Sequence, residues 1–240
     1  MRRYKEFEQL ITKDAASGTL QEPWTQLWLA DLKLAEGDPV AAQSLLEQVP
    51  LDFSPIEKIW DIRFMAALCL RDYDAANRVI ATTPAKFAYV LGGGQPPESW
   101  ADGQVALARG DKQKALAVFA AARKRLGATS ETKDQSYFEQ VARLDAGLGR
   151  KEEAIHEAQG AVDLMPIAKD SVTGVGRVVN LALVYAWTGE RDRALEQLET
   201  VATIPAGPSY GDLRFNPCWD SLRGDKRFDK IVAAAKAASR

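Results

Sequence analysis

GDKQKALAVFAAA, residues 110–122, places a glycine before a polar stretch and an alanine five residues after that glycine. Similar stretches are GDPVAA from Gly37, RDYDAA from Arg71, GRKEEA from Gly149 and GERDRA from Gly189. Their first residues lie 34, 39, 39 and 40 positions apart along the chain. A recurrence in this range is typical of stacked supersecondary units, so the sequence predicts a repeat architecture.

The stretches lie between segments in which apolar residues recur at helical spacing. WTQLWLADLKLAE (24–36), YFEQVARLDAGL (137–148) and VVNLALVYAWT (178–188) come before a glycine, and DKQKALAVFAAARKRL (111–126) and KEEAIHEAQGAVDL (151–164) come after one. The 3.6-residue period is that of amphipathic helices. Each unit is therefore predicted to be a helix, a tight turn and a second helix, which makes the fold all-α.

The residues at the turn have a physical role in such a hairpin. Glycine closes the first helix in the left-handed conformation at little steric cost. An Asp or Glu just after it is favourable at the positive N-terminus of the second helix. A small alanine early in the second helix lets the two antiparallel backbones approach closely. The alanines concerned are Ala42, Ala76, Ala115, Ala154 and Ala194.

Where the period exceeds 34 residues, the additional residues are expected to form loops between units. These are PAKFAYVLGGGQPP (84–97), GATSETKDQ (127–135) and MPIAKDSVTGVG (165–176). Clusters of proline and glycine favour loops at these places. The loops are expected to emerge on one side of the stack.

The units resemble tetratricopeptide repeats over residues 24–205. Trp60, Gly103, Phe138, Val141, Ala142, Leu181, Ala182 and Tyr185 match the first helix, Ala115, Phe119, Ala122, Ala154, Ala161, Ala194 and Leu198 match the second, and Pro84, Pro166 and Pro205 close units. Arg71 stands where the pattern has a turn glycine, and Arg63 and Phe64 stand where it has a Leu-Gly pair. The resemblance implies a right-handed α-solenoid of about five units.

The C-terminal stretch SYGDLRFNPCWDSLRGDKRFDKIV (209–232) is similar to the closing segment of repeat regions in bacterial Ser/Thr kinases, nucleotidyl cyclases and winged-helix regulators. The matching residues are Leu213, Pro217, Trp219, Asp220, Leu222, Arg223, Asp225, Arg227 and Phe228. Trp219 and Phe228 are expected to cover the last repeat, because a solenoid needs a cap at its end. The expected organisation is a flanking helix at 1–22, repeats at 23–205, and a cap segment with a helix at 206–240.

Composition restricts the classes of function. The 240 residues carry 31 Lys and Arg against 33 Asp and Glu, a net charge of −2, so nucleic-acid binding by the chain itself is disfavoured. MRRYKEFEQLITKD lacks an apolar h-region, and no run of 18 uncharged apolar residues occurs. The chain is therefore expected to be cytoplasmic, without membrane insertion.

Motifs for catalysis or cofactor binding are missing from the sequence. His156 stands in a stretch where HExxH would need a second histidine, but that position is Gly160, so His156 is expected at the surface. GGG (92–94) and TGVGR (173–177) complete no phosphate-binding motif and are expected to be turns, and ARKRL (122–126) is expected to be a solvated helix end. Cys69 and Cys218 are expected to be reduced, buried thiols. No catalytic residue, metal site or cofactor is expected.

The tetratricopeptide resemblance implies that the first helices line a concave groove. The residues it projects onto this groove are Trp24, Leu27, Asp31, Asp61, Met65, Trp100, Gln104, Leu107, Glu139, Arg143, Val179, Leu183 and Trp187. The three tryptophans are either anchors for a partner peptide or packing residues between helices. Asp31 and Asp61 stand where the carboxylate-binding version of this fold has lysine and asparagine.

Together these observations predict a non-catalytic scaffold that binds a protein or peptide partner through the groove. The alternative is a C-terminal regulatory or self-association region of a larger bacterial kinase, cyclase or transcription regulator, which leaves a homo-oligomer open. A small helical enzyme is a third hypothesis, and it lacks a supporting constellation of residues.

Overall fold

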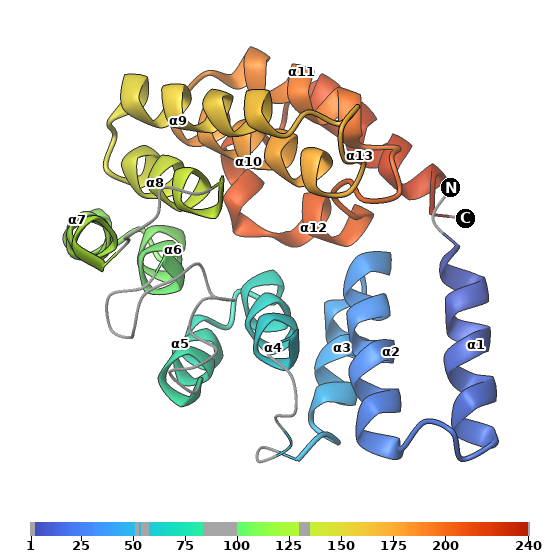
Figure 1. The fold of residues 1–240 in the computed structure, drawn as a ribbon. Coiled ribbons are helices and arrows are strands. Elements are labelled where there is room, and N and C mark those ends of the chain that lie inside the picture. The colour runs from blue at the N-terminus through green and yellow to red at the C-terminus, as the bar shows by residue number, and fades with distance from the viewer. Residues whose placement is uncertain (1–2, 51–52, 54–57, 84–99, 130–134, 240) are drawn as a thin grey trace.

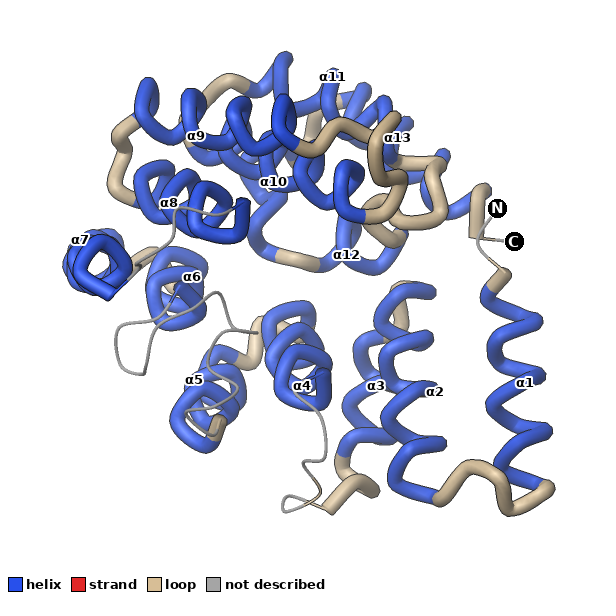
Figure 2. Tube along the Cα trace, viewed as in Figure 1, coloured by secondary structure: helices blue, strands red, loops and turns tan. Residues whose placement is uncertain are grey.

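The computed structural model describes residues 3–50, 53, 58–83, 100–129 and 135–239, and its regular structure over these ranges is helical, without strands (Figures 1 and 2). The prediction of an all-α fold is thus confirmed for the described residues. Their helices are α1 (Tyr4–Ala16), α2 (Glu22–Glu36), α3 (Pro39–Leu46), α4 (Lys58–Cys69), α5 (Tyr73–Thr82), α6 (Trp100–Ala108), α7 (Lys112–Thr129), α8 (Gln135–Gly147), α9 (Lys151–Leu164), α10 (Thr173–Trp187), α11 (Arg191–Val201), α12 (Tyr210–Phe215), the 3₁₀ helix η2 (Pro217–Leu222) and α13 (Lys226–Ala237).

The described residues form five helical hairpins that follow one another in sequence. They are α2–α3, α4–α5, α6–α7, α8–α9 and α10–α11, and each packs against the next through neighbouring helices. The additional helix α1 packs against α2 (Figure 1). None of the helices in the described ranges has the length and apolar content needed to cross a bilayer.

The hairpin turns have the backbone conformation that the sequence predicts. Gly37, Gly110, Gly149 and Gly189 have φ between 75° and 86°, and Arg71 has φ of 60° at the equivalent turn. Asp side chains accept hydrogen bonds from the second helix at three turns, namely Asp38 from the Ala41 N–H, Asp72 from the Ala75 N–H and Asp111 from the Lys114 N–H. These caps satisfy donors that a helix start leaves unpaired.

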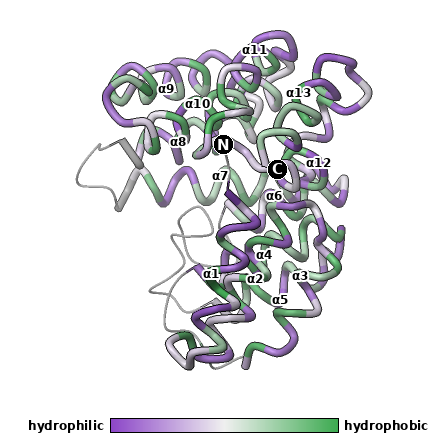
Figure 3. The backbone as a smooth tube through the Cα atoms, turned by 90° about the vertical axis from the view of Figure 1, so that its right-hand side faces the viewer, coloured by the Kyte–Doolittle hydropathy of each residue, from purple (hydrophilic) through white to green (hydrophobic). Residues whose placement is uncertain are grey.

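Small residues bring the helices of each hairpin together. The five turn-proximal alanines are at most 1% exposed. In the third hairpin, the fully buried Phe119 of α7 fits between Gly103 of α6 and Gly147 of α8. A Cβ atom added at Gly103 would lie 2.1 Å from a ring carbon of Phe119, so the ring occupies the space that a larger residue would need. Figure 3 shows that hydrophobic and hydrophilic residues alternate along the helices.

The predicted loops are shorter than expected where the structure describes them. Helix α7 continues to Thr129, so ARKRL does not end a helix, and Arg123 pairs with the buried Asp145 at 3.1 Å (Nε to Oδ2). Helix α10 begins at Thr173, so TGVGR is helical and not a turn. Asp170 accepts hydrogen bonds from the N–H groups of Val172 and Thr173, which stabilises this early start.

The glycine at position 174 also explains the early start of α10. An added Cβ there would lie 2.7 Å from backbone atoms of Pro166 and Ile167, so only glycine permits the close approach of the preceding turn. The loop expected at 84–97, with its GGG and Pro84, lies outside the described residues, as do residues 130–134 of the second loop.

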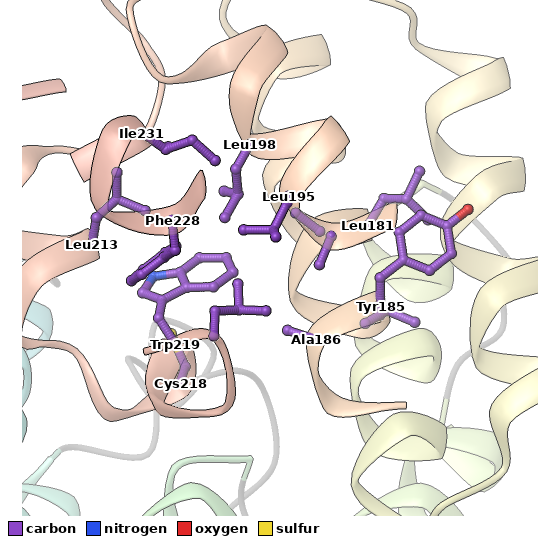
Figure 4. Packing of buried hydrophobic residues seen from close by; sticks show 14 of the residues in the cluster. Leu181, Tyr185, Ala186, Leu195, Leu198, Leu213, Cys218, Trp219, Phe228 and Ile231 are labelled. Atoms are coloured by element: carbon purple, nitrogen blue, oxygen red, sulfur yellow. The ribbon is translucent and has the colours of Figure 1, made fainter. Parts of the chain in front are cut away.

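The C-terminal residues cap the last hairpin as predicted. Trp219 and Phe228 are 2% and 1% exposed and pack with Leu195, Leu198 and Ile231 (Figure 4). Helix α13 contacts α11, and η2 contacts α10 and α11. The cap and the last hairpin therefore share one hydrophobic core.

The same C-terminal region also reaches back to the first half of the chain, which the sequence did not predict. We call residues 206–223 the closing segment. Its helix α12 contacts α2 and α4, and η2 contacts α6 (Figure 1). Gly211 lies so close to α2 that an added Cβ would be 1.7 Å from the Leu34 carbonyl oxygen.

Polar contacts hold the closing segment at both of its sides. Arg71 donates two hydrogen bonds to the Asp220 carboxylate, at 2.7 and 2.8 Å. On the other side, the Trp187 indole N–H donates to the Cys218 carbonyl at 3.0 Å, and the Ser221 hydroxyl donates to the Ala186 carbonyl at 3.1 Å. Arg71 and Asp220, which are 149 positions apart, are thereby joined. The C-terminal region thus contacts both halves of the row of hairpins.

Candidate functional site

The candidate site is a cavity between the first helices of four hairpins and the closing segment, which we call the inner cavity. Its volume is 370 Å³, within the range of small-ligand pockets. The hairpins contribute residues of α4, α6, α8 and α10, and the closing segment contributes residues from Ala206 to Trp219. The walls combine apolar side chains such as Met65 and Leu183 with a few polar ones.

The structure places seven of the projected groove residues around this cavity. They are Asp61, Met65, Trp100, Gln104, Arg143, Val179 and Leu183. Glu139 is paired with Arg177, and Leu107 and Trp187 line a second cavity described below. The first helices of the second to fifth hairpins thus bring these seven residues to a shared region.

The first hairpin does not contribute to the inner cavity. Leu27 is fully buried in the core formed by α2, α3 and α4, which corrects its assignment to a binding surface. Trp24 packs on Trp28 and edge-on against Phe53, with ring centroids 6.4 and 5.3 Å apart. Asp31 lines a separate 120 Å³ pocket with Lys58 and Asp61. The reason is that α12 covers α2 where the groove was expected to continue.

The tryptophans of the third and fifth hairpins pack between helices. Trp100 and Trp187 stack with ring centroids 4.8 Å apart, and Phe119 contacts both rings. Trp100 is 7% exposed. Most of the surface of these two tryptophans is therefore used in packing between helices. Trp100 also lines the inner cavity.

Arg143 and Asn180 form the polar centre of the inner cavity. The Arg143 Nε–H donates to Asn180 Oδ1 at 2.5 Å. Asn180 is 2% exposed, and its buried Nδ2 has no hydrogen-bond partner among the described residues. Burial lowers the pKa of the Arg143 guanidinium.

Two carboxylates, Asp61 and Asp212, also line the inner cavity. Burial raises the pKa of Asp212, which accepts hydrogen bonds from Asn216 Nδ2 at 2.8 Å and from the Trp219 indole at 3.0 Å. Asp61 pairs with Lys58 at 3.0 Å, and burial raises the pKa of the neighbouring Asp31. Asp212 thus has its own donors, whereas Asp61 and Asp31 share Lys58.

A second cavity of 580 Å³ lies where the ends of α6, α8 and α10 meet η2. Its walls are largely apolar and include Leu107, Leu116, Leu148 and Trp187. Leu116 is 47% exposed and is one of several large aliphatic side chains that this molecule leaves exposed. The cavity contains no cluster of titratable groups beyond Lys112 and Asp220 among the described residues.

Cys69, Cys218 and His156 lie as the sequence predicts. Cys69 and Cys218 are free and buried, and burial raises the pKa of the Cys69 thiol to about 12. His156 is exposed on α9. Within the described ranges, no three His, Cys, Asp or Glu side chains gather in a way that would hold a metal ion.

Sequence reasoning missed the contribution of the closing segment and of Asn180. Asn180 is a polar residue inside the apolar run VVNLALVYAW, and such a residue in a buried helix is a usable signal for a polar site. The closing segment gave no comparable signal, because its contacts with α2 and α4 join positions far apart in the chain.

A scan against protein-family models found no matching family, and searches of curated proteins and of solved structures found no match either.

Proposed function

We propose that this protein is a tetratricopeptide-like interaction module, a right-handed superhelix without catalysis of its own, that binds a short segment of a partner protein at the inner cavity. The observation that carries this proposal is the convergence of four successive first helices on one cavity. A surface built from repeated helices is preformed, so the partner and not the scaffold bears most of the ordering entropy.

The closing segment limits the kind of partner that the proposal allows. It covers the inner side of the first hairpin and part of the others, so a long extended peptide along the whole groove does not fit this arrangement. A segment of a few residues fits the 370 Å³ that remain. A dissociation constant on the order of micromolar is expected for a contact of this size.

The test is a comparison of captured partners between two matched variants. Met65→Arg places a long charged side chain in the wall of the inner cavity, and His156→Arg places the same side chain on the exposed face of α9. Proteins captured from a lysate of the source organism by the unmodified chain and by the His156 variant, but not by the Met65 variant, support the proposal. Identical captured sets from all three proteins contradict it.

The second candidate function is a regulatory or self-association region of a larger bacterial kinase, cyclase or transcription regulator. It is favoured by the C-terminal region, because Pro217, Trp219 and Phe228, three residues that carry the resemblance, are all buried in the cap. Light scattering tests the self-association part. A mass of twice 26.3 kDa or more supports it, and a monomer mass at high concentration contradicts it.

A further inference from the structure

Beyond partner binding, we propose that the inner cavity is a binding site for a carboxylate group carried on a small apolar body, held by Arg143 and Asn180. The proposal names a ligand class that the cavity can take with no partner protein present. It therefore stands or falls separately from the interaction function.

The first observation is an arginine without a counter-charge. Among the residues that the structure describes, the Arg143 side chain forms a hydrogen bond with Asn180 alone, through its Nε–H, and no carboxylate of these residues lies within ion-pair distance of it. Glu139, on the same helix α8, is engaged by Arg177 instead. A guanidinium in a partly buried site is costly unless an anion neutralises it, and its remaining N–H groups suit a carboxylate in bidentate geometry.

The second, independent observation is the orphaned amide of Asn180. Its Oδ1 accepts from Arg143, so the amide group is oriented and its Nδ2 donors point elsewhere. Nδ2 is buried and has no partner within the described part of the chain. Because a buried unpaired donor costs about 1–3 kcal/mol, an acceptor that reaches both Asn180 Nδ2 and Arg143 would satisfy two deficits at once.

The other walls of the cavity define what the carboxylate is attached to. Met65, Trp100, Val179 and Leu183 supply apolar surface, which favours an aromatic or aliphatic body over a polar one. Asp61 and Asp212 also line the cavity, and their negative charge repels a dianion such as phosphate about twice as strongly as a monoanion at the same distance. A monoanionic carboxylate with a small apolar body therefore fits best.

This chemistry has two natural sources, which are a free organic acid and the C-terminal residue of a peptide. Two probes distinguish them: 3-phenylpropanoate, and an N-acetylated tripeptide that ends in phenylalanine with a free carboxylate. The neutral amide of each probe is its matched control. Binding is measured by calorimetry and by the change in tryptophan fluorescence, since Trp100 and Trp219 both line the cavity.

Binding of a carboxylate probe at least tenfold tighter than its amide is the expected result, since a charge-assisted bond is lost in the amide. Binding of the free acid alone assigns the site to small organic acids, and binding of both acids extends it to peptide C-termini. Failure of both carboxylates to bind better than their amides overturns the proposal.

Three variants tie the binding to the two residues. Arg143→Met keeps the length of the side chain and removes its charge, and Asn180→Leu removes the amide at similar volume; each is expected to weaken the carboxylate probe at least tenfold. Arg214→Met, at an exposed position of α12 outside the cavity wall, is the matched control and is expected to leave binding unchanged. If Arg143→Met does not fold, Asn180→Leu still decides, because it removes a buried donor that has no partner in the unliganded protein. Unchanged affinity in folded Asn180→Leu would contradict the assignment.

Discussion

At the scale of single residues, glycines at apparently similar helix positions have opposite roles. Gly103 lies in α6 against Phe119, whereas an added Cβ at Gly160 in α9 would meet no atom within 4 Å. The amphipathic pattern alone cannot separate these two cases, because both glycines stand inside amphipathic helices, although the tetratricopeptide resemblance matches Gly103 to its first-helix pattern. The difference comes from a ring that lies 16 residues away along the chain and belongs to the packing of the hairpin.

This contrast gives a prediction for stability. Gly103→Ala is expected to lower the free energy of unfolding by about 1–3 kcal/mol, because Phe119 is fully buried and cannot move aside without disturbing its neighbours. Gly160→Ala is expected to raise it by about 0.5–1 kcal/mol through helix propensity. Urea unfolding of both variants measures the difference. Equal effects of the two substitutions would show that Phe119 does not confine position 103.

At the scale of elements, the hairpin turn was the feature best predicted from sequence. Its glycine, its acidic cap and its alanine are local, so each can be recognised within six residues. The helix boundaries were predicted less well, since the early start of α10 depends on Asp170 and on the close approach at Gly174. Arg71, which departs from the glycine pattern, nevertheless adopts the left-handed conformation with φ of 60°.

The bidentate contact of Arg71 with Asp220 accounts for this departure and leads to a second prediction. A non-glycine residue in the left-handed region costs about 1 kcal/mol, and a surface ion pair contributes up to about 1 kcal/mol. Arg71→Gly is therefore expected to change stability little, because relief of the backbone and loss of the pair offset each other. In an Asp220→Asn background the same substitution should be stabilising by about 1 kcal/mol.

Thermal or urea unfolding of the four proteins in this double-mutant cycle measures both values. Gly110→Ala, at a turn with φ of 84° and no neighbouring atoms, is the control for the backbone effect and should be destabilising by about 1 kcal/mol. Destabilisation by Arg71→Gly in the Asp220→Asn background would contradict the explanation.

The pH dependence of the same pair is a third prediction. Burial acts to raise the pKa of Asp220, but the hydrogen bonds from Arg71 and Arg223 outweigh it, and the pKa lies below the usual 3.8. A carboxyl whose pKa is lowered by folding stabilises the protein above pH 3.8 and loses that contribution as the pH falls through its folded-state pKa. The stability difference between the unmodified chain and Asp220→Asn should thus be constant from pH 7 to pH 5 and shrink below pH 3.8. A difference that persists at pH 2 would show that the charge of Asp220 is not its source.

At the scale of the whole molecule, the sequence predicted a row of hairpins but not its closure. Helix period, turns and the cap at the last hairpin follow from neighbouring residues, whereas the contacts of the closing segment with α2 and α4 bring together residues such as Leu34 and Gly211. No periodic pattern encodes a contact of that separation. The closing segment also determines the shape of the candidate site. It covers the first hairpin and converts an open groove into the inner cavity.

The two buried thiols make this closure measurable. Cys69 is at the end of α4 and shares a pocket with Asp212 of α12, and Cys218 is in η2 itself, so both are near the closing segment. Burial raises the pKa of Cys69 to about 12 and that of Cys218 well above its usual value, so both thiols stay protonated and protected at pH 8.

Gly211→Ala should release the segment, because the added Cβ would lie 1.7 Å from the Leu34 carbonyl oxygen and backbone cannot yield as a side chain can. We expect both cysteines of this variant to react with an aromatic disulfide reagent at least tenfold faster than in the unmodified chain, while the far-UV circular dichroism of the hairpins is retained. Gly160→Ala is the matched control and should leave both thiols protected. If both thiols of Gly211→Ala stayed protected, the hairpins would keep their inner surface buried without the closing segment. The inner cavity would then have to be explained by the hairpins alone.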